Sequence, residues 1–453
     1  MPSRFIAAIA VTAAVATGAG SARANGRFPA AQYVLVGPGT ASDVIVMRTT
    51  FGLVVSRDAG ATFHWLCEES LQYSGVWDAP VALAADSSIA VGVPDGLVRS
   101  TDWCLWPRNA TLEGTLIIDL ANDPRGETVL GIESVVGSPN HVDVSHDRGA
   151  TFTRAGSGIA DELTTVEAAA SQPTRVYVSA LVTATRAPRL YRSDDEGTTL
   201  TDTHADLGGV SEVYVSGIDP ANADRVFVRG VTDTGTRLLR STDGAATFSA
   251  RAMTTGAMLG FAVTDDGMRV WYGGPDDGLY RSDDGGDTFT RVSDLHVACL
   301  RYHAGALYIC ADWTREPFAL ARWRDGEAAP QPILAFADVM GPVDCATGTA
   351  VHDTCGTRWP AMRAMFVTRP DAGRADAEAD VASLDAAMTT DAGGGIDAAM
   401  TEGGVGAEPS GSEGCRCGVP GARTGGCSAV GAVAGALGVA GAAHRRRRRR
   451  RRR

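Results

Sequence analysis

The chain has 453 residues, 44% of them hydrophobic, so it is long enough to bury a sizeable core. Its formal net charge of −12 understates the acidity of most of the chain, because nine arginines are gathered at Arg445–Arg453. A body this acidic repels nucleic acid and anionic lipid, so we expect neither as a partner of the folded region.

The N-terminal residues 1–24 have the pattern of a secretory signal peptide. Arg4 supplies the positive charge, Phe5–Ala16 is apolar, and Ala22-Arg23-Ala24 has the small residues expected before a cleavage site. We therefore expect the mature chain to begin at Asn25 and to fold in an oxidising compartment, where disulfides are permitted.

A short motif recurs along residues 25–370, which we expect to form one domain. The pattern is Ser-x-Asp-x-Gly-x-Thr-Phe or a close variant, and successive anchor positions from Ser56 to Trp323 are 41 to 48 residues apart. A fixed period of about 40–45 residues is typical of four-stranded propeller blades. The clear copies are Ser56–Phe63, Ser145–Phe152, Ser193–Leu200, Ser241–Phe248 and Ser282–Phe289, and degraded copies occupy Ser100–Trp106 and Ala321–Gly326.

Each repeat holds four short strand-like runs separated by Gly, Asp and Pro. In one repeat these runs are Glu212–Ile218, Arg225–Gly230, Arg237–Arg240 and Thr247–Arg251. The pattern predicts an all-β fold, a seven-bladed β-propeller of four-stranded antiparallel sheets, beginning near Gln32. Six blades is the alternative, because the seventh repeat, about Leu295–Val339, rests on its degraded motif alone.

Residues 341–370 are expected to close the ring or cap its rim, with Phe366-Val367-Thr368 as an added strand. Six cysteines fall in the propeller region. Cys299 and Cys310 flank a short turn symmetrically, which predicts a disulfide across a hairpin. Cys345 with Cys355 is a second local pair, and Cys67 with Cys104 is then left by elimination. Spacing alone leaves these two pairings open.

The composition changes after Pro370. Residues 371–413 are rich in Ala, Gly and Asp and have no aromatic residue, which predicts a disordered spacer. Residues 414–453 contain a short Cys motif, the apolar run Ser428–Ala443 and the terminal arginines. This combination resembles the C-terminal sorting tag of myxobacterial surface proteins (MYXO-CTERM). The resemblance implies a short anchor helix, membrane contact only through this tail, and a protein held at the cell surface or released after processing.

The repeated motif has a structural explanation. Its aspartate carboxylate can accept hydrogen bonds from backbone N–H groups of the same turn, and its glycine permits a positive φ. The motif resembles the Asp-box, or BNR, repeat of sialidases and related propellers, in which the box is structural and lies opposite the active face. Calcium binding is the alternative, but the spacing lacks the ligands of an EF-hand, so we expect no metal and no cofactor. The matching residues are Asp58, Asp102, Asp147, Asp195, Asp243, Asp284 and Asp325.

If these turns mark the bottom face, the top face is formed by the loops between blades and between the second and third strands. The Cys310–Glu316 loop stands out, since it combines an aromatic side chain, a cation and acids. A solvated acidic rim is the simpler explanation for any one residue. The candidate ligand-binding residues are Asp312, Trp313, Arg315, Glu133, Glu162, Glu212 and His296.

Two functions fit the sequence. The first is a non-catalytic, monomeric propeller that binds a glycan or a surface protein through its top face. The second is an exo-sialidase or another glycoside hydrolase. The resemblance to sialidases lacks their F/Y-R-I-P motif, and no pair of carboxylates stands out, so we assign no catalytic residue and favour the binding protein.

Overall fold

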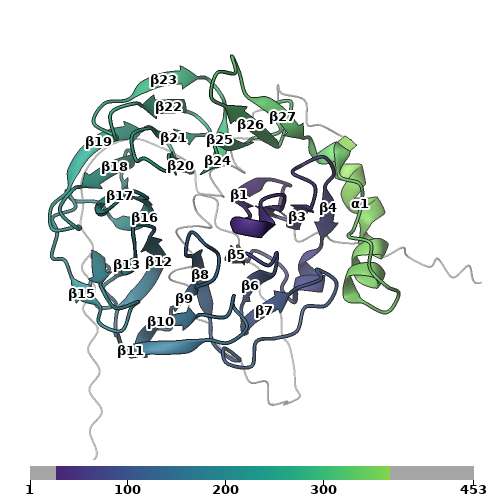
Figure 1. Ribbon diagram of the computed structural model, residues 1–453, viewed down its shortest axis with the longest axis horizontal. Coiled ribbons are helices and arrows are strands. Elements are labelled where there is room, and N and C mark those ends of the chain that lie inside the picture. Colours follow the sequence, from purple (N-terminus) through teal and green to yellow (C-terminus); the bar gives the residue numbers. More distant parts are fainter. Residues whose placement is uncertain (1–26, 368–453) are drawn as a thin grey trace, which may run out of the picture. The chain divides into compact units, whose positions relative to one another are not determined.

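The computed structural model describes residues 27–367, which form seven antiparallel sheets arranged in a ring (Figure 1). The seven-bladed prediction is confirmed, and the six-bladed alternative is wrong. Six sheets have four strands. The second has three, and an isolated bridge between Val98 and Arg108 takes the place of its fourth strand. The predicted signal peptide, spacer and C-terminal tail (1–24, 371–413 and 414–453) lie outside the described residues.

The blades follow one another in chain order, and the first strand of each blade lies nearest the centre of the ring (Figure 1). The strands of the first three blades are β1 Ala31–Val36, β2 Ile45–Thr49, β3 Gly52–Ser56, β4 His64–Leu66; β5 Val81–Leu83, β6 Ile89–Val93, β7 Gly96–Ser100; β8 Ile117–Asn122, β9 Val129–Glu133, β10 Asn140–Ser145 and β11 Thr153–Ile159.

The remaining four blades have four strands each. Their strands are β12 Glu162–Ala169, β13 Gln172–Leu181, β14 Pro188–Ser193, β15 Thr201–Asp202; β16 Glu212–Asp219, β17 Asn222–Thr232, β18 Gly235–Ser241, β19 Ser249–Thr254; β20 Gly260–Val263, β21 Val270–Gly274, β22 Gly278–Ser282, β23 Thr290–Ser293; β24 Val297–His303, β25 Ala306–Ala311, β26 Leu320–Arg324 and β27 Gln331–Leu334. Short helical segments occupy Gly39–Ala41, Glu68–Leu71, Phe336–Asp338 and Val351–Cys355, and helix α1 spans Gly356–Val367.

The clear copies of the repeated motif form one kind of turn between the third and fourth strands. In the fifth blade the Ser241 hydroxyl donates to Asp243 Oδ1 at 2.8 Å, and the Thr247 amide and hydroxyl donate to the same carboxylate at 2.9 and 2.6 Å. The bonds from Thr247 and then Ser241 lower the pKa of Asp243 to about 2. Ala245 has φ +70°, which is why glycine is usual there. The carboxylates held in the same way are Asp58, Asp147, Asp195 and Asp284.

The two degraded copies differ from each other. Asp102 still accepts the Ser100 hydroxyl at 3.0 Å and the amides of Cys104 and Leu105 at 2.9 Å. Asp325 departs from the pattern, since it forms an ion pair with Arg269 of the sixth blade. In the turn that contains Asp325, the Glu327 carboxylate accepts a hydrogen bond from the Arg324 amide at 2.8 Å. A different residue therefore stabilises this turn of the last blade.

Within residues 27–367 no strand is exchanged between the first and last blades. Residues 341–367, here called the clasp, cross the seam instead. The Trp65 amide of β4 donates to Gly341 O at 2.7 Å, and the Val343 amide donates to Trp65 O at 3.1 Å. Helix α1 follows and lies along the outside of the first blade (Figure 1). The expected ring closure is thus confirmed. The added strand at Phe366 is wrong, because this residue belongs to α1.

Three disulfides are present in the described residues. The hairpin bridge Cys299–Cys310 is confirmed, whereas the other two expected pairings are wrong. The clasp carries two cysteines past the seam, and these bond to Cys67 at the end of the first blade and to Cys104 of the second. The observed bridges are Cys67–Cys355 and Cys104–Cys345, with sequence separations of 288 and 241.

An aromatic cluster lies between the clasp and the seam. Phe366 of α1 contacts Phe51 and Phe336 with ring centroids 5.3 and 5.4 Å apart, and Trp359 contacts Trp65 at 5.6 Å. Aromatic side chains bury large apolar areas, so this cluster contributes strongly to the stability of the closed ring.

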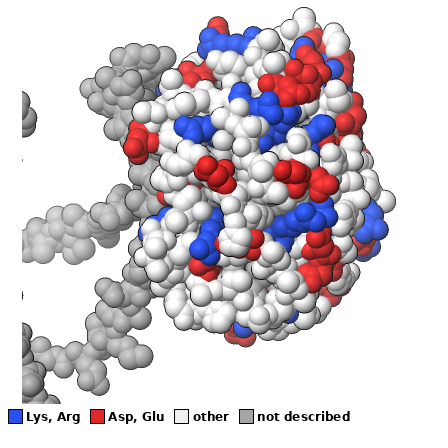
Figure 2. All heavy atoms as spheres, turned by 90° about the vertical axis from the view of Figure 1, so that its left-hand side faces the viewer, with Lys and Arg blue, Asp and Glu red and all other residues white. Residues whose placement is uncertain are grey.

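The outer edges of the fourth and fifth blades carry charges of both signs, which Figure 2 shows as interspersed acidic and basic side chains. Arg175 pairs with Asp194 at 2.6 Å, and Arg240 and Arg251 both pair with Asp287, at 2.5 and 3.1 Å. Of these arginines, Arg251 lies on the outermost strand β19, where a charge discourages pairing with another chain.

Candidate functional site

The top loops of the sixth and seventh blades bring several predicted residues together. His296 Nδ1 lies 2.8 Å from Glu316 Oε1, and the Asp312 amide donates to His296 O at 2.9 Å. Arg315 then joins two carboxylates, since it lies 3.3 Å from Asp312 and 3.0 Å from Asp276. These acids and cations largely form ion pairs and hydrogen bonds with one another. Such pairing holds the loops of the rim together.

Trp313 is not the exposed aromatic platform that its loop suggested. It is 8% exposed, and its indole N–H donates to Pro29 O at 2.5 Å. Its ring stacks on Phe28 at 5.5 Å and packs edge-on against Phe336 at 5.6 Å. The side chain turns inward because the seam offers both an apolar cluster and a partner for the N–H group.

Two of the predicted glutamates are buried in ion pairs. Glu162 is paired with Arg186. Glu133 accepts His141 Nδ1 at 2.5 Å and Arg154 at 3.0 Å. Near Glu133 and Arg154, Asp143 is fully buried, and neither of its carboxylate oxygens has a hydrogen-bond partner. Burial, and then the charge of Glu133, raise the pKa of Asp143 to about 7.

The inner strands carry a set of polar side chains that the sequence did not single out. We call Tyr33, Arg48, Asp119, Glu167 and Arg301 the channel group. They come from β1, β2, β8, β12 and β24, which belong to four blades around the ring. The charges of the other four all act on the Tyr33 phenol, and burial is the main cause that raises its pKa.

The two carboxyl groups of this set have unusual acidities. Burial raises the pKa of Asp119 to about 6, although the Val166 amide donates to its Oδ2 at 2.9 Å. Burial, and then the negative charge of Asp119, raise the pKa of Glu167 to about 7. Both carboxyl groups therefore hold a proton at a higher pH than exposed carboxyl groups do.

A second tyrosine lies on the inner strand of the fifth blade. The Tyr214 hydroxyl donates to Glu212 Oε2 at 2.5 Å, and the Arg229 guanidinium lies 5.0 Å from the Tyr214 ring centroid. The positive charge of Arg229 also acts on Asp119. Glu212 is thus the predicted top-face residue that contacts this second tyrosine.

The sequence does contain a signal for the channel group. Asp119 follows two isoleucines in β8, and Glu167 lies between Val166 and Ala168 in β12. A polar residue on an inner strand of a closed ring must face the centre or find a partner.

The part of the chain that the structure describes holds no cluster of three or more His, Cys, Asp or Glu residues suited to a metal ion. Among residues 27–367, none of the helices combines the length and the apolar character that crossing a bilayer requires.

Seven sheets arranged radially in a ring define a β-propeller. No family model and no curated protein matches the sequence. Solved structures match the fold, among them an ancestral GH74 enzyme with 14% identity and a TM-score of 0.52. This match covers 71% of the present chain and 48% of that enzyme. Others are the GH74 enzyme of Niastella koreensis (13% identity, TM-score 0.40, 66% and 65% covered) and the hydrazine synthase of Kuenenia stuttgartiensis (9%, 0.49, 66% and 96%).

The likeness to the ancestral GH74 enzyme supports the fold alone. The chain spans about half the length of the ancestral GH74 enzyme that it matches. The three disulfides are consistent with an extracellular location, because such bonds persist in oxidising compartments.

Proposed function

We propose that this chain is a secreted or cell-surface propeller that binds an extracellular ligand, in the first place a glycan, at the top of its central channel. The observation that carries this proposal is that charged side chains from four blades act on the buried Tyr33 phenol. Sugars are recognised by a few directed polar groups beside aromatic rings. Tyr33 and Tyr214 supply rings, and Asp119, Glu167 and the arginines supply acceptors and donors.

The bottom turns are structural in this proposal, in keeping with the resemblance to Asp-box propellers. A surface protein is the other partner that the top face could accept. The signal peptide and the sorting tag, both expected from the sequence, would deliver the propeller to the outer surface of the cell. No catalytic step is required for this role.

A glycan-array screen of the intact chain tests the proposal. Asp119→Asn and Arg48→Ala should each lower affinity for any glycan that binds by about tenfold or more, since each removes a charged hydrogen-bonding group. Asp312→Ala on the rim is the matched control and should change affinity less than about twofold. Loss of binding in the rim variant, with channel variants unaffected, would move the site to the loops.

Glycoside hydrolysis is the second candidate, and the paired acidities of Asp119 and Glu167 favour it specifically. The Tyr214–Glu212 hydrogen bond adds a polarised phenol. Against a sialidase, the arginines are divided between two tyrosines. Arg48 and Arg301 act on Tyr33, whereas Arg229 and Arg186 act on Tyr214.

Fluorogenic sialosides and β-glycosides distinguish the two candidates. A hydrolase would turn over one of them, with Glu167→Gln reducing kcat by about a hundredfold or more. Turnover abolished by that substitution would replace the binding proposal with the enzyme. Binding without turnover would support the proposal as stated.

A further inference from the structure

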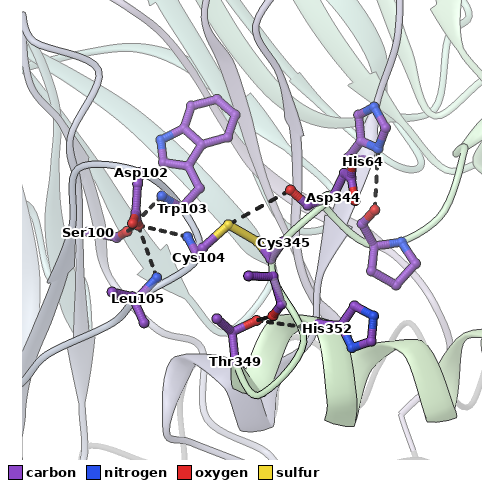
Figure 3. The surroundings of a disulfide bond; sticks show 12 residues. His64, Ser100, Asp102, Trp103, Cys104, Leu105, Asp344, Cys345, Thr349 and His352 are labelled. Atoms are coloured by element: carbon purple, nitrogen blue, oxygen red, sulfur yellow. Dashed lines mark hydrogen bonds between the residues drawn. A yellow bond between two sulfur atoms is a disulfide. The ribbon is translucent and has the colours of Figure 1, made fainter.

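The disulfide between Cys104 and Cys345 lies at a cleft, unlike the other two bridges. The cleft has a volume of about 610 Å³ and is lined by the clasp residues Pro342, Val343, Asp344, Cys345, His352, Asp353, Gly356 and Thr357. Figure 3 shows the bridge with Cys104 on the turn of the second blade and Cys345 on the clasp.

The other bridges are sealed. Cys67, Cys355 and Cys310 are 0% exposed and Cys299 is 2% exposed, whereas Cys345 is 7% exposed and Cys104 is half-buried. Thiol–disulfide exchange requires a thiolate to reach one sulfur in line with the bond, so access decides which bridge reacts first.

We propose that Cys104–Cys345 is a modification site, at which an external thiol exchanges with the disulfide and releases the clasp from the second blade. The thiolate attacks Sγ of Cys345 from the cleft, forming a mixed disulfide, and the bond to Cys104 breaks with its electron pair on the Cys104 sulfur. A second thiol of the same reagent then displaces Cys345. The protein bridge is thereby reduced by two electrons and the dithiol is oxidised to its disulfide.

The charge of the cleft indicates which thiols react fastest. Asp344 is exposed, and Asp353 is ionised because the His352 hydrogen bond and then the Gly348 amide hold the pKa of its carboxyl below the usual value. Two carboxylates at the entrance repel an anionic reagent and attract a cationic one, and salt screens both effects.

Release would be local. Cys67–Cys355 still ties the clasp to the first blade, the Arg358–Glu69 ion pair at 3.0 Å remains, and the Phe366 cluster is untouched. Reduction therefore frees residues 341–349 and the Asp102–Leu105 turn from each other, while the ring stays closed.

Differential alkylation of the intact native chain tests the site. Under graded dithiothreitol, peptide mapping should find Cys104 and Cys345 labelled at least about tenfold faster than the four cysteines of the sealed bridges. Hydrogen exchange of residues 341–349 should rise at the same point. First labelling of a sealed pair, or labelling of all six cysteines together, would overturn the proposal.

Three monothiols of one length test the charge argument. The rate of each thiol with the protein is divided by its rate with a small neutral disulfide, which corrects for intrinsic reactivity. At low salt, cysteamine should then react a few-fold faster than mercaptoethanol, and mercaptoethanesulfonate a few-fold slower. The Asp344→Asn, Asp353→Asn double variant should remove this order, with Asp338→Asn outside the cleft as the control. An order unchanged by the double variant would show that the cleft does not control access.

Discussion

The carboxylate of Asp119 on β8 accepts the amide of Val166 on β12 at 2.9 Å, so an ionisable side chain of the third blade is tied to the backbone of the fourth. The same carboxyl has its pKa raised to about 6, chiefly by burial. One residue therefore couples the packing of two blades to the protonation state of the channel.

Asp119→Asn keeps an acceptor for Val166 and removes the charge. The folded state holds the Asp119 proton more tightly than the unfolded state does, so this residue lowers stability as pH rises from about 4 to about 6. The variant should be about 1 kcal/mol more stable at pH 7, after allowance for partial exposure. Urea unfolding between pH 4 and pH 8 measures the effect, and a pH dependence identical to that of the wild type would contradict it.

Asp143→Asn should have a larger effect, because this side chain is fully buried and its oxygens are unpartnered. Its pKa is about 7 in the folded state, so the wild type loses stability as pH rises from about 4 to 7. We expect the variant to gain about 1–3 kcal/mol at pH 8 and almost nothing at pH 4. The facing groups Glu133, His141 and Arg154 stay in place, so a gain that persists at pH 4 would point to another cause.

Asp147→Ala removes the carboxylate that accepts the Thr151 amide at 2.8 Å and hydroxyl at 2.6 Å in the turn of the third blade. Loss of these bonds should destabilise the fold by about 1–2 kcal/mol. Asp325→Ala is the matched control and should cost less than about 0.5 kcal/mol, since it removes only an exposed ion pair. Equal losses in thermal unfolding would mean that the turn bonds are not the cause.

Trp313→Ala distinguishes a core residue from a ligand platform. The side chain contacts Phe28 and Phe336, so its removal should cost about 3–5 kcal/mol. Trp313→Phe should recover much of that stability while leaving ligand affinity unchanged. A variant with normal melting and lost affinity would restore Trp313 as a binding residue.

The two disulfide variants compare a long loop with a short one. Replacing Cys67 and Cys355 by serine removes a bridge between cysteines that are 288 residues apart in sequence. Replacing Cys299 and Cys310 removes one between cysteines 11 residues apart. Because the Cys104–Cys345 bridge stays closed and leaves only residues 67–104 and 345–355 in the larger loop, loop-closure entropy predicts losses of about 4 and about 3 kcal/mol respectively. Guanidinium unfolding of the two variants gives the comparison, and a greater loss from the hairpin bridge would contradict the entropic account.

The sequence was most informative where its signals are local. The repeat period and the alternation of Glu212–Ile218 predicted the blades, and symmetric spacing predicted the Cys299–Cys310 bridge. The clasp bridges could not be derived in this way, because Cys67 and Cys355 meet only when the first and last parts of the ring are side by side. Single members of the channel group can be found from polar residues within inner strands, but their grouping cannot, since Tyr33 and Glu167 belong to different blades.

The long reach of the clasp bridges has a consequence for biosynthesis. Cys67 and Cys104 emerge from the ribosome well before Cys345 and Cys355, which are 241 or more residues further on. An oxidising compartment entered N-terminus first would offer the early cysteines only each other as partners. The native bridges then require an isomerase to reshuffle a premature Cys67–Cys104 bond, and the yield of secreted protein should depend on that enzyme.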